Sequence, residues 1–293
     1  MAWQIALCLF FLTAVGQSLL QRAYSQTSRL PESFPPAISY LIGVTPLGII
    51  VGLSMSHHVH WSWWLGFLLL LEGLFIGLYN WLSFMAVKRL PLARYQTIYQ
   101  VYELVVIALG WGLLAEGLNV WQVLGGLLIL AAAFLAIRAP IKAQQQLHKH
   151  ASAPAVVLTL LAALTMGIGL VAEKAALRHM DMGAYFIFGY GTQTLSILAL
   201  AAKDISRPAL KAFRLYDFKR SLGMGILSAT TGFFYIAAIV NSDNISLITA
   251  LGAFTLPLTV LAAYLFLRER DELKLVLGGV AVGFLGLIIS AIK

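Results

Sequence analysis

The sequence predicts an all-α integral membrane protein, with ten transmembrane helices arranged as two inverted five-helix repeats. Of its 293 residues, 60% are hydrophobic and 11% are charged, whereas soluble domains contain about 25% charged residues. Ten apolar segments are long enough to cross a bilayer, which takes about 17 to 25 residues in a helix. A polar stretch near the midpoint separates five of these segments from the other five.

Prolines and basic clusters mark the boundaries of the ten segments. Pro35 and Pro36 stand at the start of the second segment, and Lys88 to Pro91 precede the fourth. Proline and charged residues of this kind are typical of helix ends. The predicted spans are residues 3–21, 36–55, 62–87, 91–114, 119–138, 154–176, 182–202, 219–240, 245–267 and 273–291.

The two halves of the chain are similar in sequence. Leu124-Gly125-Gly126 recurs as Leu277-Gly278-Gly279, an offset of 277 − 124 = 153 residues, and Gly16 matches Gly169 at the same offset. Each half has an odd number of helices, so the second must enter the membrane in the opposite sense. Inverted repeats of this kind are common in secondary transporters.

A polar linker separates the two predicted repeats. Residues 139–152 form the longest polar interruption that lacks an apolar face. The predicted organisation is therefore a first repeat over residues 1–138, the linker over 139–152, and an inverted second repeat over 153–293.

The basic residues predict the orientation in the membrane. Of the 20 Lys and Arg residues, all except Lys174, Arg178 and Lys293 flank the loops after odd-numbered segments. By the positive-inside rule these loops are cytoplasmic, and both termini lie outside a multi-pass protein of the cell (inner) membrane. The basic residues do not form one aromatic-interleaved face, so the expected partner is the lipid bilayer and not nucleic acid.

The fourth segment contains the most polar helix face in the chain. At about 100° per residue, one arc of roughly 160° holds all its tyrosines, glutamines and its acid. These candidate solute-binding residues are Tyr95, Gln96, Tyr99, Gln100, Tyr102 and Glu103. The tyrosines could bind a cationic solute through cation–π attraction, or pack helix against helix with their hydroxyls bonded across the interface.

The third segment contains a second intramembrane acid, Glu72, which shares an arc with Tyr79 and Asn80. Counted from Leu90 at the turn, Glu72 and Glu103 lie 90 − 72 = 18 and 103 − 90 = 13 residues away. At about 1.5 Å per residue, their depths differ by roughly 7 Å, so both are expected to face one chamber. An acid in a membrane indicates a functional site by default, here for solute binding or proton coupling. The alternative is a protonated acid bonded to a tyrosine or a backbone carbonyl.

Other polar residues are weaker candidates. Secondary lining of the chamber is expected from Gln17, Tyr190, Gln193 and Tyr235. An ion-pair cluster at the outer face, or an outer gate, is expected from Glu173, Lys174, Arg178 and His179. His57, His58 and His60 lack a Cys or carboxylate partner, so no metal is expected. No phosphate-binding loop or nucleophile elbow is present, so neither an enzyme nor a cofactor is predicted.

Residues 238–280 resemble the repeat signature of the ten-helix, EamA-like branch of the drug/metabolite transporter (DMT) superfamily. Pro257 stands at the mid-helix proline of that signature, Glu269 at its loop acid, and Gly278-Gly279 at its close-packing glycines. In the first half, Glu103 stands at the acid and Leu104 replaces the proline. The resemblance covers essentially the whole chain.

The resemblance implies alternating access along a pathway between the halves, lined mainly by helices 1, 3, 4, 6, 8 and 9, with helices 5 and 10 peripheral. Many members are similar in keeping their termini cytoplasmic, which is the reverse of what the charges predict here.

The leading hypothesis is a secondary transporter, a permease or exporter, of a small organic solute. The tyrosines and acids favour an amine-bearing solute such as an amino acid or organic cation, with protons as a possible coupling ion. One alternative is a flippase for a lipid-linked headgroup, which would favour basic residues within the membrane. Another is a non-transporting membrane scaffold or assembly subunit.

Overall fold

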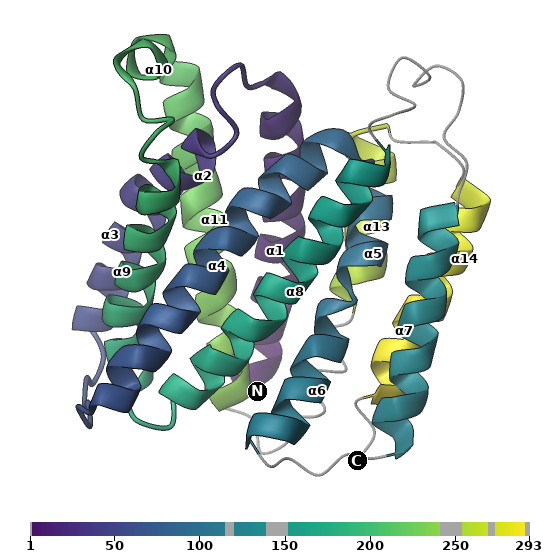
Figure 1. The fold of residues 1–293 in the computed structure, drawn as a ribbon, viewed down its shortest axis with the longest axis horizontal. Coiled ribbons are helices and arrows are strands. Elements are labelled where there is room, and N and C mark those ends of the chain that lie inside the picture. Colours follow the sequence, from purple (N-terminus) through teal and green to yellow (C-terminus); the bar gives the residue numbers. More distant parts are fainter. Residues whose placement is uncertain (1, 115–119, 139–151, 241–253, 269–272, 291–293) are drawn as a thin grey trace.

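The computed structural model describes residues 2–114, 120–138, 152–240, 254–268 and 273–290, which form a bundle of helices (Figure 1). Its elements are α1 (Ala2–Thr27), α2 (Phe34–Ser39), the π-helix η1 (Tyr40–Val44), α3 (Thr45–Leu53), α4 (Trp63–Arg89), α5 (Leu92–Tyr99), α6 (Tyr102–Leu114), α7 (Val120–Arg138), α8 (Ser152–Ala176), α9 (Met182–Ala201), α10 (Arg207–Ala212), α11 (Leu215–Val240), α13 (Thr255–Phe266) and α14 (Leu273–Ser290). Residues 139–151 of the predicted linker lie outside this description, as does Glu269.

The all-helical membrane class is confirmed, but the predicted number of ten spans is not. Within the described part of the chain, seven helices are long and apolar enough to cross a membrane. They are Trp3–Thr27, Phe34–Leu53, Trp63–Arg89, Val120–Arg138, Ala153–Ala176, Met182–Ala201 and Leu215–Ala238. The predicted ninth and tenth spans contain the shorter apolar helices Thr255–Phe266 and Leu277–Gly286.

The prediction of one continuous helix over 91–114 is wrong, because the chain breaks at Gln100 and Val101 between α5 and α6. The amide of Val101 donates to the carbonyl of Ile98 at 3.2 Å, and that of Glu103 to Gln100 at 3.1 Å. These i to i+3 bonds tighten the chain locally. Residues 92–109 around the break contain no proline or glycine, so the local sequence carried no signal for a break.

The second predicted span is one helix that contains a π-turn. The amide of Thr45 bonds to the carbonyl of Tyr40, five residues earlier. Pro46 follows directly and has no amide hydrogen to continue the α-helical pattern, which accounts for the local rearrangement. π-Turns are frequently found at functional sites.

The packing of the helices has the symmetry expected of two repeats: the main helix pairs between the halves have counterparts when corresponding helices are swapped. In the predicted repeat, α1, α4 and α7 correspond to α8, α11 and α14. Accordingly, α4 packs on α8 and α1 packs on α11, while α7 packs on α14. Gly43 of η1 faces Gly225 of α11 so closely that an added Cβ would lie 2.7 Å from the Gly225 Cα. The pairing supports the inverted repeat, which remains a prediction.

Figure 1 shows α7 and α14 together at one edge of the bundle. This position agrees with the peripheral place that the resemblance implies for helices 5 and 10.

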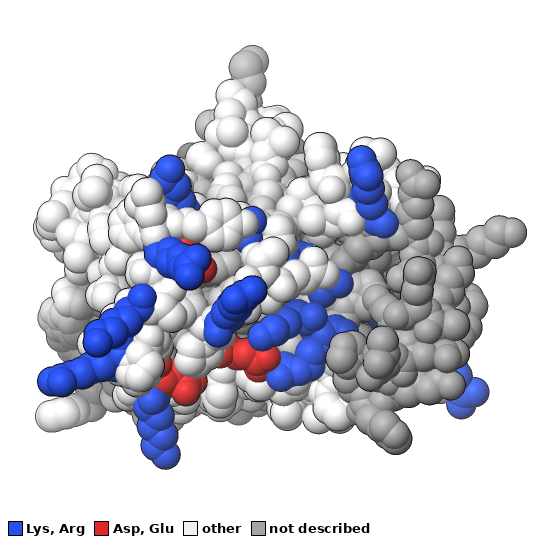
Figure 2. Space-filling view, turned by 90° about the horizontal axis from the view of Figure 1, so that it is seen from above, with Lys and Arg blue, Asp and Glu red and all other residues white. Residues whose placement is uncertain are grey.

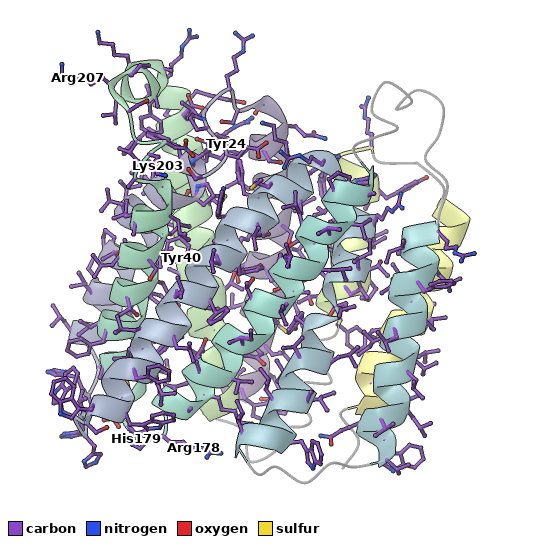
Figure 3. The ribbon with its side chains drawn as sticks, in the orientation of Figure 1. Tyr24, Tyr40, Arg178, His179, Lys203 and Arg207 are labelled. Atoms are coloured by element: carbon purple, nitrogen blue, oxygen red, sulfur yellow. The ribbon has the colours of Figure 1, made fainter. Side chains whose placement is uncertain are left out.

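The two ends of the bundle differ in charge. We call the end where α1, α4 and α9 terminate the basic face. Figure 2 shows many Lys and Arg side chains gathered there, and Figure 3 places Lys203 and Arg207 at this end and Arg178 at the opposite end. Both chain termini are marked at the opposite end in Figure 1. The charge separation expected from the sequence is therefore present, and which face is cytoplasmic remains a prediction.

Candidate functional site

A cavity of about 260 Å³ lies inside the bundle. Its described lining comes from η1 and from helices α1, α4, α5, α6, α8, α9, α11 and α13. Every predicted site residue except Glu72 lines it. These residues are Gln17, Tyr79, Asn80, Tyr95, Gln96, Tyr99, Gln100, Tyr102, Glu103, Tyr190, Gln193 and Tyr235. The arc found in the sequence therefore faces one cavity despite the break between α5 and α6.

Four tyrosines form a continuous aromatic wall on one side of the cavity. The ring centroid of Tyr99 lies 5.5 Å from those of Tyr79 and Tyr95, and 4.9 Å from that of Tyr102. Tyr79 comes from α4, Tyr95 and Tyr99 from α5, and Tyr102 from α6. Stacking of this kind orders the rings, which adds about 0.5 to 1.5 kcal/mol per pair. We call these residues the tyrosine wall.

Hydrogen bonds hold the tyrosine wall against α1 and α4. The Tyr95 hydroxyl lies 2.7 Å from the hydroxyl of Ser83, which accepts a bond from the Gln21 amide at 2.9 Å. On the next turn, the Gln96 amide donates to Ser18 at 3.1 Å. The rings thus pack between helices and also line the cavity, so the two roles considered from the sequence are compatible.

Tyr40 is a lining residue that the sequence did not single out. The Asn80 amide donates to its hydroxyl at 2.8 Å, and Figure 3 places Tyr40 midway along the bundle. Tyr40 begins η1, so the π-turn before Pro46 determines how this tyrosine meets the cavity. The Thr45-Pro46 pair was the only local signal.

Glu103 lies in the first turn of α6 and lines the cavity. The break at Gln100 and Val101 gives α6 its own amino terminus, where the helix dipole stabilises a negative charge by about 0.3 to 1 kcal/mol. The neighbouring Tyr102 lines the same cavity. Glu103 therefore places a carboxyl group in the cavity beside the tyrosine wall.

Glu72 lies behind the cavity wall. It is fully buried and is not among the described lining residues. The Tyr185 hydroxyl donates to one of its oxygens at 2.9 Å, the Gln193 amide donates to the same oxygen, and the Thr192 hydroxyl lies 3.5 Å from the other. Glu72 thereby joins α4 to α9. Its partners Tyr185 and Gln193 line the cavity in its place.

Glu173 lines the cavity, although the sequence suggested an ion-pair cluster at the outer face. Met166, Leu170 and Glu173 follow at helical spacing on one face of α8, and all three line the cavity. Tyr185 lines the same cavity as Glu173. The signal in the sequence was this i, i+4, i+7 spacing, which the adjacent Lys174 obscured.

The charges of the cavity are of one sign. Among the described residues that line it, Glu103 and Glu173 are the only ionisable acids, and none is Lys, Arg or His. The other polar groups are tyrosines, amides and hydroxyls. Within the described part of the chain, no group of His, Cys, Asp and Glu side chains is arranged to hold a metal. The lining is therefore suited to a cation with hydrogen-bonding groups.

The cavity is sealed toward the basic face. On α1 its lining ends at Gln21, and beyond it Arg22, Tyr24 and Ser25 are buried. The Tyr24 hydroxyl lies 3.1 Å from that of Ser221 on α11. Arg220 donates to the carbonyl of Ala23 at 3.3 Å. We call this arrangement of Tyr24, Ser221 and Arg220 the basic-face seal.

Away from the basic face, the lining continues further along the helices. It reaches Phe10 on α1, Glu173 near the end of α8 and Ile236 on α11. The cavity is thus displaced from the bundle's middle toward the end opposite the basic face.

Comparison with known proteins agrees with this architecture. A solved protein crystal structure is similar with a TM-score of 0.62 and 19% sequence identity, covering 95% of this chain and 97% of the other. At that identity the likeness establishes the fold alone. No curated protein sequence matches the chain. The sequence model of the EamA-like transporter family matches residues 2–138. The resemblance predicted from the sequence is therefore confirmed over the first half of the chain, which is similar to the EamA-like transporter family, a family of membrane transporters.

Proposed function

We propose that the protein is a secondary transporter of a small amine-bearing organic solute, an amino acid or an organic cation, in exchange for protons. The observation that carries this proposal is the lining of the cavity. It combines two carboxyl groups and the tyrosine wall with no basic side chain among the described lining residues.

The proposed binding mode places the solute's ammonium group near Glu103 and its body along the tyrosine wall. Each tyrosine face attracts a cation by about 0.5 to 2 kcal/mol, depending on how far it is desolvated. Gln96, Gln100 and Asn80 add hydrogen-bonding groups on the same lining. A charge-assisted bond to Glu103 would be the strongest single contact.

The size of the cavity limits the solute. A volume of about 260 Å³ lies just below the roughly 300 to 1,000 Å³ of common ligand pockets. A small solute such as a single amino acid or a simple amine is therefore expected.

Transport by alternating access requires the cavity to close on one side and open on the other. The basic-face seal supplies one such closure, formed between α1 of the first predicted repeat and α11 of the second. The positive-inside rule favours a cytoplasmic basic face in the cell membrane. On that assignment, the present conformation is closed to the cytoplasm.

The lining gives less support to a lipid flippase, because a headgroup phosphate requires basic groups and the described lining offers none. A scaffold without a ligand predicts that no solute stabilises the protein. Both alternatives can be separated from transport by one ligand screen.

The test is a thermal-shift screen of the purified protein with amines, amino acids, sugars and nucleosides. A ligand that binds only the native state stabilises it by about 2.7 kcal/mol at a concentration of one hundred times its Kd. We expect amines to raise Tm and neutral sugars to leave it unchanged.

In the same screen, Glu103→Gln should reduce the shift that amines produce, whereas Glu32→Gln should retain it in full. Glu32 is the matched control because it is paired with Lys88 and Arg89 near the basic face, away from the cavity. Stabilisation by sugars or by a lipid headgroup, with no response to amines, would contradict the proposal.

A further inference from the structure

A second polar group lies in the cavity besides the tyrosine wall and Glu103. It is centred on Tyr185 of α9, which is nearly fully buried, donates to one carboxyl group and lines the cavity together with a second. One is the buried Glu72 of α4, and the other is the cavity-lining Glu173 of α8. We call Glu72, Glu173, Tyr185 and Gln193 the paired-acid site.

The hydrogen bonds of the paired-acid site determine where protons can be. A tyrosine hydroxyl has one proton to donate and can accept two bonds. Tyr185 donates its proton to Glu72 at 2.9 Å and accepts a bond from the Gln193 amide at 3.3 Å. Its one proton is therefore committed to Glu72, and Tyr185 cannot also donate a hydrogen bond to Glu173.

The two acids are not equivalent. Glu72 is fully buried, and Tyr185, Gln193 and Thr192 donate hydrogen bonds to its two oxygens. Glu173 borders the cavity, where water can take up or deliver a proton. The proton of this pair that can exchange is thus the one on Glu173.

Other ionisable groups surround Glu173. Lys174, Arg178 and His179 follow it at the end of α8 and in the next turn. From neighbouring elements, the described ionisable groups in the same cavity are Tyr40 on η1, Tyr79 on α4, Tyr95 and Tyr99 on α5, Tyr102 and Glu103 on α6, Tyr185 and Tyr190 on α9, and Tyr235 on α11. Glu72 on α4 is buried behind this lining. The basic residues lie at the bundle end and outside the described lining, so the cavity side of Glu173 meets tyrosines and acids.

We propose that Glu173 binds the coupling proton and that Glu103 binds the solute's ammonium group. This inference rests on the proposed function and adds a division of labour between the two lining acids. When a cationic solute enters, its charge favours loss of the Glu173 proton. The O–H bond of the carboxyl then breaks, the proton passes to cavity water, and Tyr185 retains its bond to Glu72. When the solute leaves, Glu173 takes a proton back from water.

The exchange is reciprocal, because two ligands that oppose each other's binding do so by the same factor. Protonation of Glu173 lowers the affinity for the solute, and solute binding expels the proton. A proton gradient can therefore drive solute movement in the opposite direction.

The first experiment needs no solute. Infrared spectroscopy of the purified protein follows the protonated carboxyl band from mildly acidic to mildly alkaline pH. We expect a band that titrates in the wild type, is lost in Glu173→Gln and shifts in Tyr185→Phe, which removes a polar group from the same cavity lining. Glu32→Gln is the control and should leave the band unchanged. A titrating band that persists unaltered in Glu173→Gln would overturn the inference.

The second experiment uses tyramine as the amine and measures its affinity and the protons released on binding. Wild-type protein should release a proton, and Glu173→Gln should bind tyramine with the proton release and the pH dependence of Kd both lost. Glu103→Gln should instead bind tyramine about tenfold or more weakly.

The outcomes distinguish the two proposals. Failure of every amine in the earlier screen, tyramine included, would contradict the proposed function, while the infrared result still decides whether Glu173 exchanges a proton. Tyramine binding with unchanged proton release in Glu173→Gln would overturn the coupling role of Glu173 alone.

Discussion

The basic-face seal predicts that small changes at Tyr24 open the cavity toward that face. The Tyr24 side chain is fully buried, and its ring lies edge-on to that of Phe84 at 5.9 Å. It also packs with Met224 and Leu20. Its hydroxyl lies 3.1 Å from that of Ser221. These contacts join α1 to α4 and α11, which must separate if the basic face opens.

The expected magnitudes follow from the contacts that each substitution removes. Tyr24→Phe keeps the ring and loses one hydrogen bond, worth about 1 kcal/mol, or about a fivefold shift in the equilibrium between closed and open forms. Tyr24→Ala removes the ring as well. Deleting a buried aromatic side chain costs about 3 to 5 kcal/mol, so a shift above about one hundredfold is expected if the ring is buried only in the closed form.

The assay is cysteine labelling from the basic face. Cys8 is the only cysteine in the chain, so Cys8→Ser with Gln21→Cys gives a single thiol on the cavity lining. A membrane-impermeant maleimide should label it slowly with Tyr24, about fivefold faster with Tyr24→Phe and much faster with Tyr24→Ala. Tyr216→Phe, at an exposed tyrosine of the same face, is the control. Unchanged labelling in a folded Tyr24→Ala protein would refute the role of the seal.

Further substitutions test packing and the buried acid. Gly225→Ala should lower stability by about 1 to 3 kcal/mol through overpacking, because its Cβ would lie 2.8 Å from the Cα of Gly43. Gly66→Ala, whose Cβ would meet nothing within 4 Å, should not lower Tm, and equal effects of the two would contradict the close packing. Glu72→Ala should leave Tyr185 and Gln193 without their acceptor. It should lower the free energy of unfolding by about 1 to 3 kcal/mol or more, the cost of an unsatisfied buried group. An unchanged Tm would argue against the link that Glu72 makes between α4 and α9. Glu32→Gln should cost less than about 1 kcal/mol because its ion pairs are partly exposed, and a larger loss of Tm would disqualify it as a control.

Much of the site could be predicted because helical periodicity requires only the sequence. The polar side chains of the arc from Tyr95 to Glu103 all line the cavity, although α5 ends at Tyr99 and α6 begins at Tyr102. The break itself could not be predicted from local sequence. It coincides with tertiary contacts, among them the close approach of Gly167 on α8 to the carbonyl of Tyr102, at 3.0 Å from an added Cβ.

The two acids Glu72 and Glu173 show what periodicity leaves open. Both were recognised as ionisable residues in or beside a span, but their depth relative to other helices depends on how α4, α8 and α9 pack. Tyr185 donates to Glu72 from a helix more than one hundred residues away in sequence. Such a contact follows from the fold, so the sequence alone could not show that Glu173 reaches the cavity while Glu72 lies behind it.

The most direct test of the account is a comparison of tyramine with its uncharged analogue, 4-ethylphenol, in binding to wild-type and Glu103→Gln protein. Charge-assisted hydrogen bonds are worth about 1.5 to 3 kcal/mol, so the wild type should prefer the amine by about tenfold or more. In Glu103→Gln the two affinities should become similar, with 4-ethylphenol still bound by the tyrosine wall. An equal preference for the amine in both proteins would contradict a binding role for Glu103 and, with it, the proposed recognition of the solute.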